Sequence, residues 1–172
     1  MAYRSGTYVA FHAGGTSDPI ASDIRYYRML TAWHEHDGIE FRIVDSHEKA
    51  AAVRDSSSRA RLRAVLAERL RSSKNMVVII GQTTRFDTDW VPFEIEYAVD
   101  TCEIPIIAAY PGLDFVVAPL ALAGLWPAAL ASRIRSGAAH VIHVPFKREP
   151  LRDAIGQFSH DNYPVGQGLT VC

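Results

Sequence analysis

The sequence lacks the features that mark secreted, membrane-spanning and nucleic-acid-binding proteins. Its two cysteines, Cys102 and Cys172, lie far apart and form no metal-binding or redox motif, so we expect a reducing, cytoplasmic location. No signal peptide is evident, and no apolar run approaches the roughly 18 to 20 residues of a membrane span. The net charge of -1 gives no reason to expect nucleic acid or an anionic membrane surface as a partner.

Several common catalytic and nucleotide-binding motifs are also missing. There is no GxGxxG and no GxxxxGK[ST], which excludes two familiar phosphate-binding loops, and no GxSxG elbow follows a strand. His34, His36 and His47 are the candidates for metal ligands. However, side chains two positions apart on a helix point in different directions, and a structural zinc site needs four clustered ligands. We therefore expect no metal and no bound cofactor.

What is present indicates one soluble domain of 172 residues, with 48% hydrophobic and 22% charged residues. We expect its core over about residues 7–160 and an irregular, glycine-rich tail over residues 161–172. Apolar, β-branched runs predict five strands, at residues 7–12, 40–44, 76–80, 104–109 and 140–145. Helical patterns lie between them, at residues 22–35, 58–72, from 90 onward, 119–135 with a break at Pro127, and 150–158.

This alternation predicts a flavodoxin-like α/β fold, with a five-stranded parallel sheet in the order 2-1-3-4-5 and helices on both faces. Ligands of such sheets bind where the strand order reverses, at the carboxyl ends of the strands. Three loops should meet there: Phe11–Ser17, Asp45–Glu48 and Gln82–Trp90. Gly14 and Gly15 would let the backbone approach a phosphate, although a plain tight turn explains them equally well.

The helix after Asp89 offers two carboxylates to this crevice. At 100° per residue, its buried stripe comprises Val91, Ile95, Ala98, Val99 and Cys102. Glu94 and Glu96 lie on opposite shoulders of that stripe, and the helix dipole favours the ionised form of Glu94 near the amino terminus. Periodicity does not choose between the two, and both are also compatible with ordinary boundary positions.

The helix predicted over residues 58–72 is rich in arginine. Its basic side chains are Arg59, Arg61, Arg63, Arg69 and Arg71. Such a cluster is compatible with phosphate or RNA binding, but in a chain of near-zero net charge we interpret it as a solvated helix face. We expect no nucleic-acid partner.

Four segments resemble the TIR domain superfamily, and more closely the bacterial TIR-like proteins that include the Thoeris antiphage components. Residues 8–12 are similar to the first strand of that family, residues 42–45 to its second, and residues 73–80 to its third. The most specific match is residues 89–95, DWVPFEI, which is similar to the W-[hydrophobic]-x-x-E segment of enzymatically active members. The resemblance covers about residues 7–110.

The resemblance implies an NAD-cleaving enzyme, a glycohydrolase or cyclase that releases nicotinamide and makes an ADP-ribose-derived signal in antiphage defence. In NAD-cleaving members the glutamate of the matched segment is catalytic, which selects Glu94. The implied partners are NAD as substrate, further copies of the chain and a separate effector that senses the product. Phe11 and His12 stand where many members have Tyr and Arg. A non-catalytic module for nucleotide binding or protein interaction is therefore the alternative.

The candidate substrate-binding residues are Phe11, His12, Asp45, Ser46, Thr83 and Trp90. Phe11 and Trp90 are candidates for packing against nicotinamide or ribose, with ordinary core packing as the alternative interpretation. Asp45 is a candidate for contact with ligand or with a neighbouring subunit. Residues 47–58 are the candidate contact for self-association.

Overall fold

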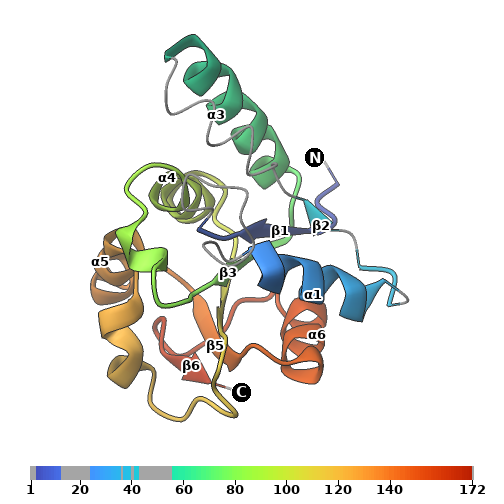
Figure 1. Cartoon of the computed structure of the whole chain (residues 1–172), viewed down its shortest axis with the longest axis vertical. Coiled ribbons are helices and arrows are strands. Elements are labelled where there is room, and N and C mark those ends of the chain that lie inside the picture. Colours follow the sequence, from blue (N-terminus) through green and yellow to red (C-terminus); the bar gives the residue numbers. More distant parts are fainter. Residues whose placement is uncertain (1–2, 13–23, 36, 40, 43–55, 172) are drawn as a thin grey trace.

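The protein is built around a six-stranded parallel sheet (Figure 1) in the order β2-β1-β3-β4-β5-β6. The computed structural model describes residues 3–12, 24–35, 37–39, 41–42 and 56–171. The strands are β1 (Thr7–Ala10), β2 (Phe41–Arg42), β3 (Asn75–Ile79), β4 (Ile106–Tyr110), β5 (Val141–Pro145) and β6 (Thr170–Val171). All residues of β1, β3, β4 and β5 are buried, because helices cover the sheet on both sides.

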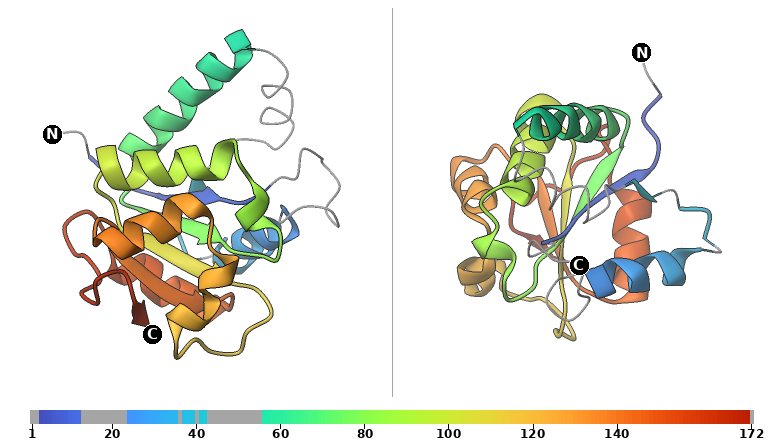
Figure 2. Two further views of the ribbon diagram at one scale, coloured as in Figure 1. Left: turned by 90° about the vertical axis from the view of Figure 1, so that its left-hand side faces the viewer. Right: turned by 45° about the horizontal axis from the view of Figure 1, so that its top comes forward.

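Figure 2 shows this layering, with two groups of helices separated by the sheet. The main helices are α1 (Ile24–His34), α3 (Ser56–Arg71), α4 (Trp90–Glu96), α5 (Ala128–Ser136) and α6 (Arg148–Gln157). Shorter helical segments are η1 (Thr84–Phe86), η2 (Tyr97–Thr101) and η3 (Pro119–Leu125). One apolar core lies beneath α3, α4 and α5, and a second lies beneath α1 and α6. The amino-terminal part of α3 projects beyond the body of the molecule (Figure 1).

The predicted fold class and the strand order 2-1-3-4-5 are confirmed, and the structure adds a sixth strand. The prediction of an irregular tail over residues 161–172 is therefore wrong in part. In β6, Thr170 and Val171 pair with Ile142 and His143 of β5. Gly168 allows this pairing because its backbone adopts a φ of +81°, a conformation that glycine reaches without steric cost.

The other predicted strands and helices agree with the structure to within a few residues where it describes them. β4 begins at Ile106 because Pro105 has no N–H to contribute to the sheet, although its carbonyl accepts a hydrogen bond from Met76 N (3.0 Å). The expected break at Pro127 is confirmed, since it separates η3 from α5. β2 comprises Phe41–Arg42, and the rest of the predicted strand 40–44 lies outside the described residues.

Asn75 connects the sheet to the carboxyl end of α6. Its Nδ2 donates hydrogen bonds to the carbonyls of Ile155 (3.0 Å) and Phe158 (2.7 Å), and Thr7 Oγ1 donates to its Oδ1 (2.7 Å). The last carbonyls of a helix have no partner within the helix, so a buried helix end needs an external donor. The amide of Asn75 supplies that donor.

α4 continues into η2, a single widened turn of π-helix in which Cys102 N donates to the carbonyl of Tyr97 (3.0 Å). Turns of this kind are frequent at functional sites. The buried stripe predicted for this helix is confirmed, because all of its members are buried: Val91, Ile95, Ala98, Val99 and Cys102.

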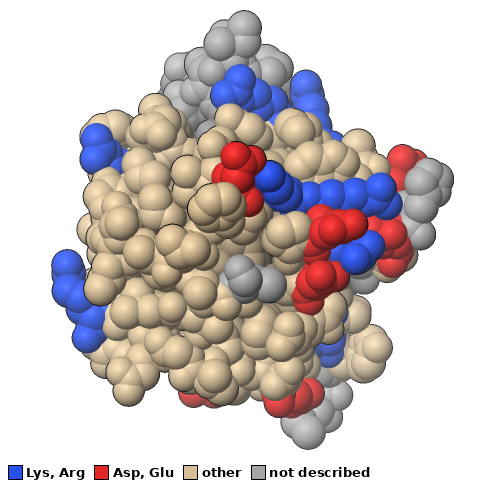
Figure 3. Space-filling view, turned by 90° about the horizontal axis from the view of Figure 1, so that it is seen from below, with Lys and Arg blue, Asp and Glu red and all other residues tan. Residues whose placement is uncertain are grey.

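The surface is mixed in character. Seen from below in Figure 3, acidic and basic side chains gather on the right, further basic side chains lie at the left edge and the top, and a broad area between them carries none. Three large apolar side chains are exposed after β4, namely Phe115 (71%), Val117 (77%) and Leu120 (65%). No helix within the described part of the chain is long and apolar enough to cross a membrane.

Candidate active site

The structure separates the two glutamates that periodicity left equivalent. Glu94 is fully buried on α4, whereas Glu96, two positions further along, is exposed. The difference arises because Val91 and Ile95 face the sheet and turn the shoulder that carries Glu94 toward β1. Glu94 is therefore the carboxylate of this helix that the fold removes from solvent.

Tyr8 of β1 is the hydrogen-bond partner of this carboxylate. Its Oη donates to Glu94 Oε1 over 2.5 Å, and both side chains are fully buried. Burial raises the pKa of Tyr8 well above its ordinary value, and the charge of Glu94 and this hydrogen bond raise it further. The phenol thus remains protonated and acts as a donor to the carboxylate.

Asp87 connects the end of β1 to the start of α4. Its Oδ1 accepts hydrogen bonds from the backbone amides of Asp89 (2.9 Å) and Trp90 (3.0 Å), and its Oδ2 lies 3.3 Å from His12 Nδ1. Burial works to raise the pKa of Asp87, but the bonds from His12 and from the two amides outweigh it and lower the pKa. These contacts fix where α4 begins and therefore where Glu94 lies.

The loop before α4 is held by Thr84 rather than by Thr83. Thr84 is buried, and its Oγ1 accepts from Gly81 N (2.8 Å) and donates to the carbonyl of Ile79 (3.2 Å). Thr83 is exposed at the surface of the same loop. The structure thus gives the loop the buried hydroxyl of Thr84 as an anchor and leaves Thr83 exposed.

The two candidate aromatic residues lie on opposite sides of the sheet. Trp90 is buried in the core beneath α3, α4 and α5, on the same side as Glu94, in agreement with core packing. Phe11 belongs to the core beneath α1 and α6, and its ring stacks on Tyr27 with centroids 5.6 Å apart. The structure therefore places His12, Trp90 and Glu94 on the α4 side and does not bring Phe11 to them.

Two of the predicted site residues, Asp45 and Ser46, lie outside the described residues, as do Gly14 and Gly15. In the part of the chain that the structure does describe, no three His, Cys, Asp or Glu side chains are grouped so that they could hold a metal ion. His34 is buried, and its Nδ1 lies 2.8 Å from Asp37 Oδ2.

Sequence reasoning missed Tyr8, Thr84 and Asp87. Asp87 carried a readable signal, because an aspartate in a loop commonly accepts hydrogen bonds from the backbone amides that follow it by two or three residues. Tyr8 gave none, since a tyrosine within a short apolar strand is indistinguishable from ordinary core. Its partner lies 86 positions away in the sequence.

The arginines of α3 contact the aromatic residues of the helical segment opposite. Arg59, Arg63 and Arg71 lie over the rings of Trp90 (5.9 Å), Phe93 (4.9 Å) and Tyr97 (5.9 Å) respectively. Arg59 Nη2 also donates to Asp89 Oδ1 (3.2 Å). These three side chains are therefore part of the α3–α4 packing, and the interpretation of a purely solvated face is corrected for them.

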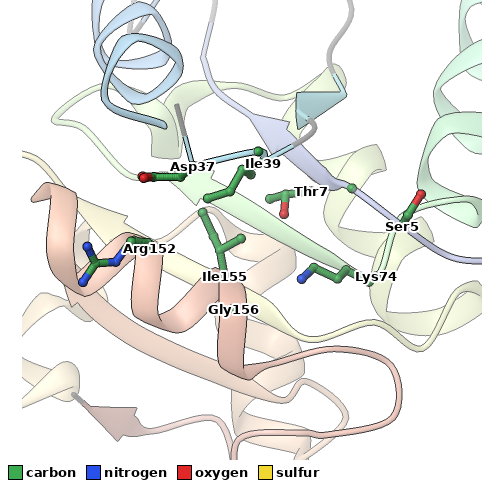
Figure 4. A pocket seen from close by; sticks show the side chains of 10 residues that line it. Ser5, Thr7, Asp37, Ile39, Lys74, Arg152, Ile155 and Gly156 are labelled. Atoms are coloured by element: carbon green, nitrogen blue, oxygen red, sulfur yellow. The ribbon is translucent and has the colours of Figure 1, made fainter. Parts of the chain in front are cut away.

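A cavity of about 510 Å³ lies at the amino ends of the strands (Figure 4), opposite the predicted crevice. Its lining includes Thr7, Asp37, Lys74, Arg152 and Ile155. The carboxyl ends of α1 and α6 meet this edge of the sheet, and helix carboxyl ends disfavour anions. The positive charges of Lys74 and Arg152 offset the negative potential of these helix ends, so the cavity has no clear preference for one sign of charge.

This sheet order, with helices on both faces, defines a doubly wound α/β domain of the flavodoxin-like class. A family model described as Thoeris protein ThsB, TIR-like domain, matches residues 8–114, and the chain belongs to this family. The match confirms the resemblance seen in the sequence and includes β1, β3, α4 and β4. No curated protein matches the chain.

Proposed function

We propose that the protein cleaves NAD, releasing nicotinamide and making an ADP-ribose-derived product, with Glu94 as the catalytic carboxylate. The observation that carries the proposal is the placement of Glu94, which is fully buried on α4 and held by Tyr8 at 2.5 Å. Cleavage of a glycosidic bond passes through an oxocarbenium-like transition state. A fixed carboxylate in a site with little water stabilises the developing positive charge far better than a mobile, solvated one.

The proposal includes a conformational step, because a residue with no exposed surface cannot meet a substrate directly. We infer that a trigger or an assembly step exposes Glu94 before turnover. His12, Thr83 and Trp90 are the described residues proposed to contact NAD, with Asp45 and Ser46 from the second loop. Phe11 would join them only if the end of β1 rearranges.

The wider role follows from the family and is likewise proposed. We expect a diffusible product to act on a separate effector in antiphage defence within the cytoplasm, with NAD as substrate and no bound cofactor. Self-association of the chain is part of the proposal, with residues 47–58 as the expected contact. The exposed apolar side chains of Phe115, Val117 and Leu120 support it, because clustered exposed apolar surface often marks an interface. Sedimentation of a strict monomer under activating conditions would count against self-association.

The test is nicotinamide release from NAD by purified protein, alone and with lysate of phage-infected cells. Glu94→Gln keeps the size of the side chain and removes its charge, so we expect at least a 100-fold loss of rate. Glu96→Gln is the matched control, since it makes the same change on the exposed shoulder of the same helix. Equal release by wild type and Glu94→Gln would overturn the assignment.

A non-catalytic module that binds nucleotides or other proteins is the second candidate function. It is favoured by Phe11 and His12, which stand where many family members have Tyr and Arg, and by the packing of Phe11 in the core beneath α1 and α6. Calorimetry with NAD and with ADP-ribose separates the two candidates. Tight binding without nicotinamide release under activating conditions would support the module.

A further inference from the structure

Tyr8 lies against the proposed catalytic carboxylate, although no sequence motif points to it. Its Oη donates to Glu94 Oε1 over 2.5 Å, and neither side chain has any exposed surface. A hydrogen bond to an ionised acceptor is shorter and stronger than one between neutral groups. The bond joins the strand at the switch in strand order to the helix after the third strand.

The backbone around Tyr8 is fixed from both sides. Tyr8 lies opposite Met76 of β3 and opposite Arg42 of β2, so β1 has a partner on each edge at this position. A residue in such a strand cannot swing away as a loop or lid does. This geometry favours a permanent support for Glu94 over a removable cover.

The charged groups that face Tyr8 keep its hydroxyl in the donor role. Burial raises the pKa of Tyr8 most, and the charge of Glu94 on α4 raises it further, whereas Arg69 of α3 lowers it. The net effect is a rise, so the phenol holds its proton at neutral pH. Glu94 Oε1 is then the acceptor of a bond whose donor does not ionise.

We propose that Tyr8 is a positioning residue for Glu94, whose hydroxyl fixes one carboxylate oxygen and favours the ionised form of that carboxylate. This inference rests on the proposed NAD cleavage, in which Glu94 meets the ribose. In this proposal Tyr8, whose side chain is fully buried in the core, acts through Glu94 and does not itself contact the substrate. Its contribution is orientation and charge, of the kind that supporting residues give to reacting groups.

Tyr8→Phe removes the hydroxyl and keeps the ring, which makes it the direct test. Tyr110→Phe is a matched control, because Tyr110 is also a buried tyrosine in the same core, bonded to Trp126 and His143. The first readout is the titration of Glu94, followed by NMR of protein labelled with ¹³C at the glutamate carboxyls. The Glu94 signal is assigned by its absence in Glu94→Gln.

We expect the midpoint of the Glu94 titration to move to higher pH in Tyr8→Phe and to stay in place in Tyr110→Phe. Loss of a donor to a carboxylate destabilises its charged form, which sets the direction. An unchanged midpoint in a folded Tyr8→Phe protein overturns the proposal. This readout needs no turnover, so it decides the question even if the proposed function fails.

The second readout is the kinetics of nicotinamide release. A mispositioned carboxylate lowers kcat by about 10- to 100-fold with little change in KM, while Tyr110→Phe stays close to wild type. Absence of release from wild type counts against the proposed function alone. Release by Tyr8→Phe at the wild-type kcat, with an unmoved Glu94 midpoint, overturns the positioning role and leaves the function of Glu94 standing.

Discussion

His12 Nδ1 lies 3.3 Å from Asp87 Oδ2. This contact joins the segment that follows β1 to the loop that precedes α4. Because Asp87 also accepts two backbone amides of that loop, the pair links two of the segments expected to form the ligand crevice. The contact is largely sheltered, with side-chain exposures of 17% for His12 and 9% for Asp87.

Asp87→Asn should destabilise the fold by about 1 kcal/mol at neutral pH, because hydrogen bonds to a charged carboxylate are replaced by weaker bonds to a neutral amide. The pKa of Asp87 is lower in the folded state than its ordinary value of 3.8. The carboxylate therefore contributes stability above that value, and the contribution is lost as pH falls through the folded pKa. Urea unfolding between about pH 3 and 5 should show a flatter pH dependence in the variant.

Asp114→Asn is the control for that measurement. The Asp114 carboxylate pairs with Lys147 (2.7 Å) at the surface, and such exposed pairs contribute little. The hydrogen bond from Lys147 lowers its pKa as well, but solvent screens the effect. If Asp87→Asn lowers the free energy of unfolding no more than Asp114→Asn does, the role given to Asp87 is contradicted.

His143 should make the fold sensitive to mild acid. Trp126 Nε1 donates to the Tyr110 hydroxyl (2.8 Å), which lies 2.7 Å from His143 Nδ1, and His143 Nε2 lies 2.8 Å from the Gly168 carbonyl. Since a carbonyl only accepts, Nε2 carries the proton and Nδ1 accepts from the Tyr110 hydroxyl. This chain of donors is complete only with a neutral imidazole.

Burial lowers the pKa of His143 below 6.5, against the opposing effect of its bond to Gly168. The unfolded chain then binds the proton more readily, so this stability is complete above about pH 6.5 and is lost as pH falls. His143→Leu should cost about 2–4 kcal/mol at pH 7.5 and remove part of the decline toward pH 5.5. His140→Leu, an exposed position, is the control, and an equal decline in wild type and His143→Leu would refute the prediction.

Gly168→Ala should destabilise the last strand. The glycine has a φ of +81°, and an added Cβ would lie 3.1 Å from the carbonyl oxygen of Ala139. The combined strain should cost about 1–2 kcal/mol, measured by urea unfolding. Gly124→Ala is the control, because a Cβ there meets nothing within 4 Å, and equal stability of the two variants would rule out the strain.

The Arg63–Phe93 contact should contribute a measurable coupling between α3 and α4. The guanidinium carbon lies 4.9 Å from the ring centroid. A double-mutant cycle with Arg63→Gln and Phe93→Leu should give a coupling of about 0.5–1 kcal/mol in thermal unfolding. Repeating the cycle with Arg61→Gln, another exposed arginine of α3, should give a coupling near zero. Equal values would argue against a specific contact.

Much of the fold could be predicted because its strands are buried on both faces. A strand such as β3 then consists of one apolar run, which is readable without knowledge of its neighbours. β6 could not be read in this way, since two residues after a glycine-rich segment carry no periodic pattern. Its pairing depends on the positive φ of Gly168 and on the hydrogen bond between His143 Nε2 and the carbonyl of Gly168.

The candidate site was predictable only in part. Helical phase placed Glu94 and Glu96 symmetrically, and tertiary packing against β1 made one buried and the other exposed. Phe11 and Glu94 both lie in or next to loops that were predicted to form the crevice. However, side chains alternate along β1, and this alternation places Phe11 in the core on the opposite side of the sheet. Contacts between distant side chains, such as Tyr8 with Glu94, have no local signature.

The bounds of the family match have a practical consequence. Residues 8–114 end just after β4, but β4 pairs along its whole length with β5, and Asn75 needs the end of α6. A fragment cut at those bounds would turn Ile106–Tyr110 into an open, apolar sheet edge. Edges of this kind recruit strands from other molecules, so such a fragment should aggregate and would misreport both oligomeric state and activity.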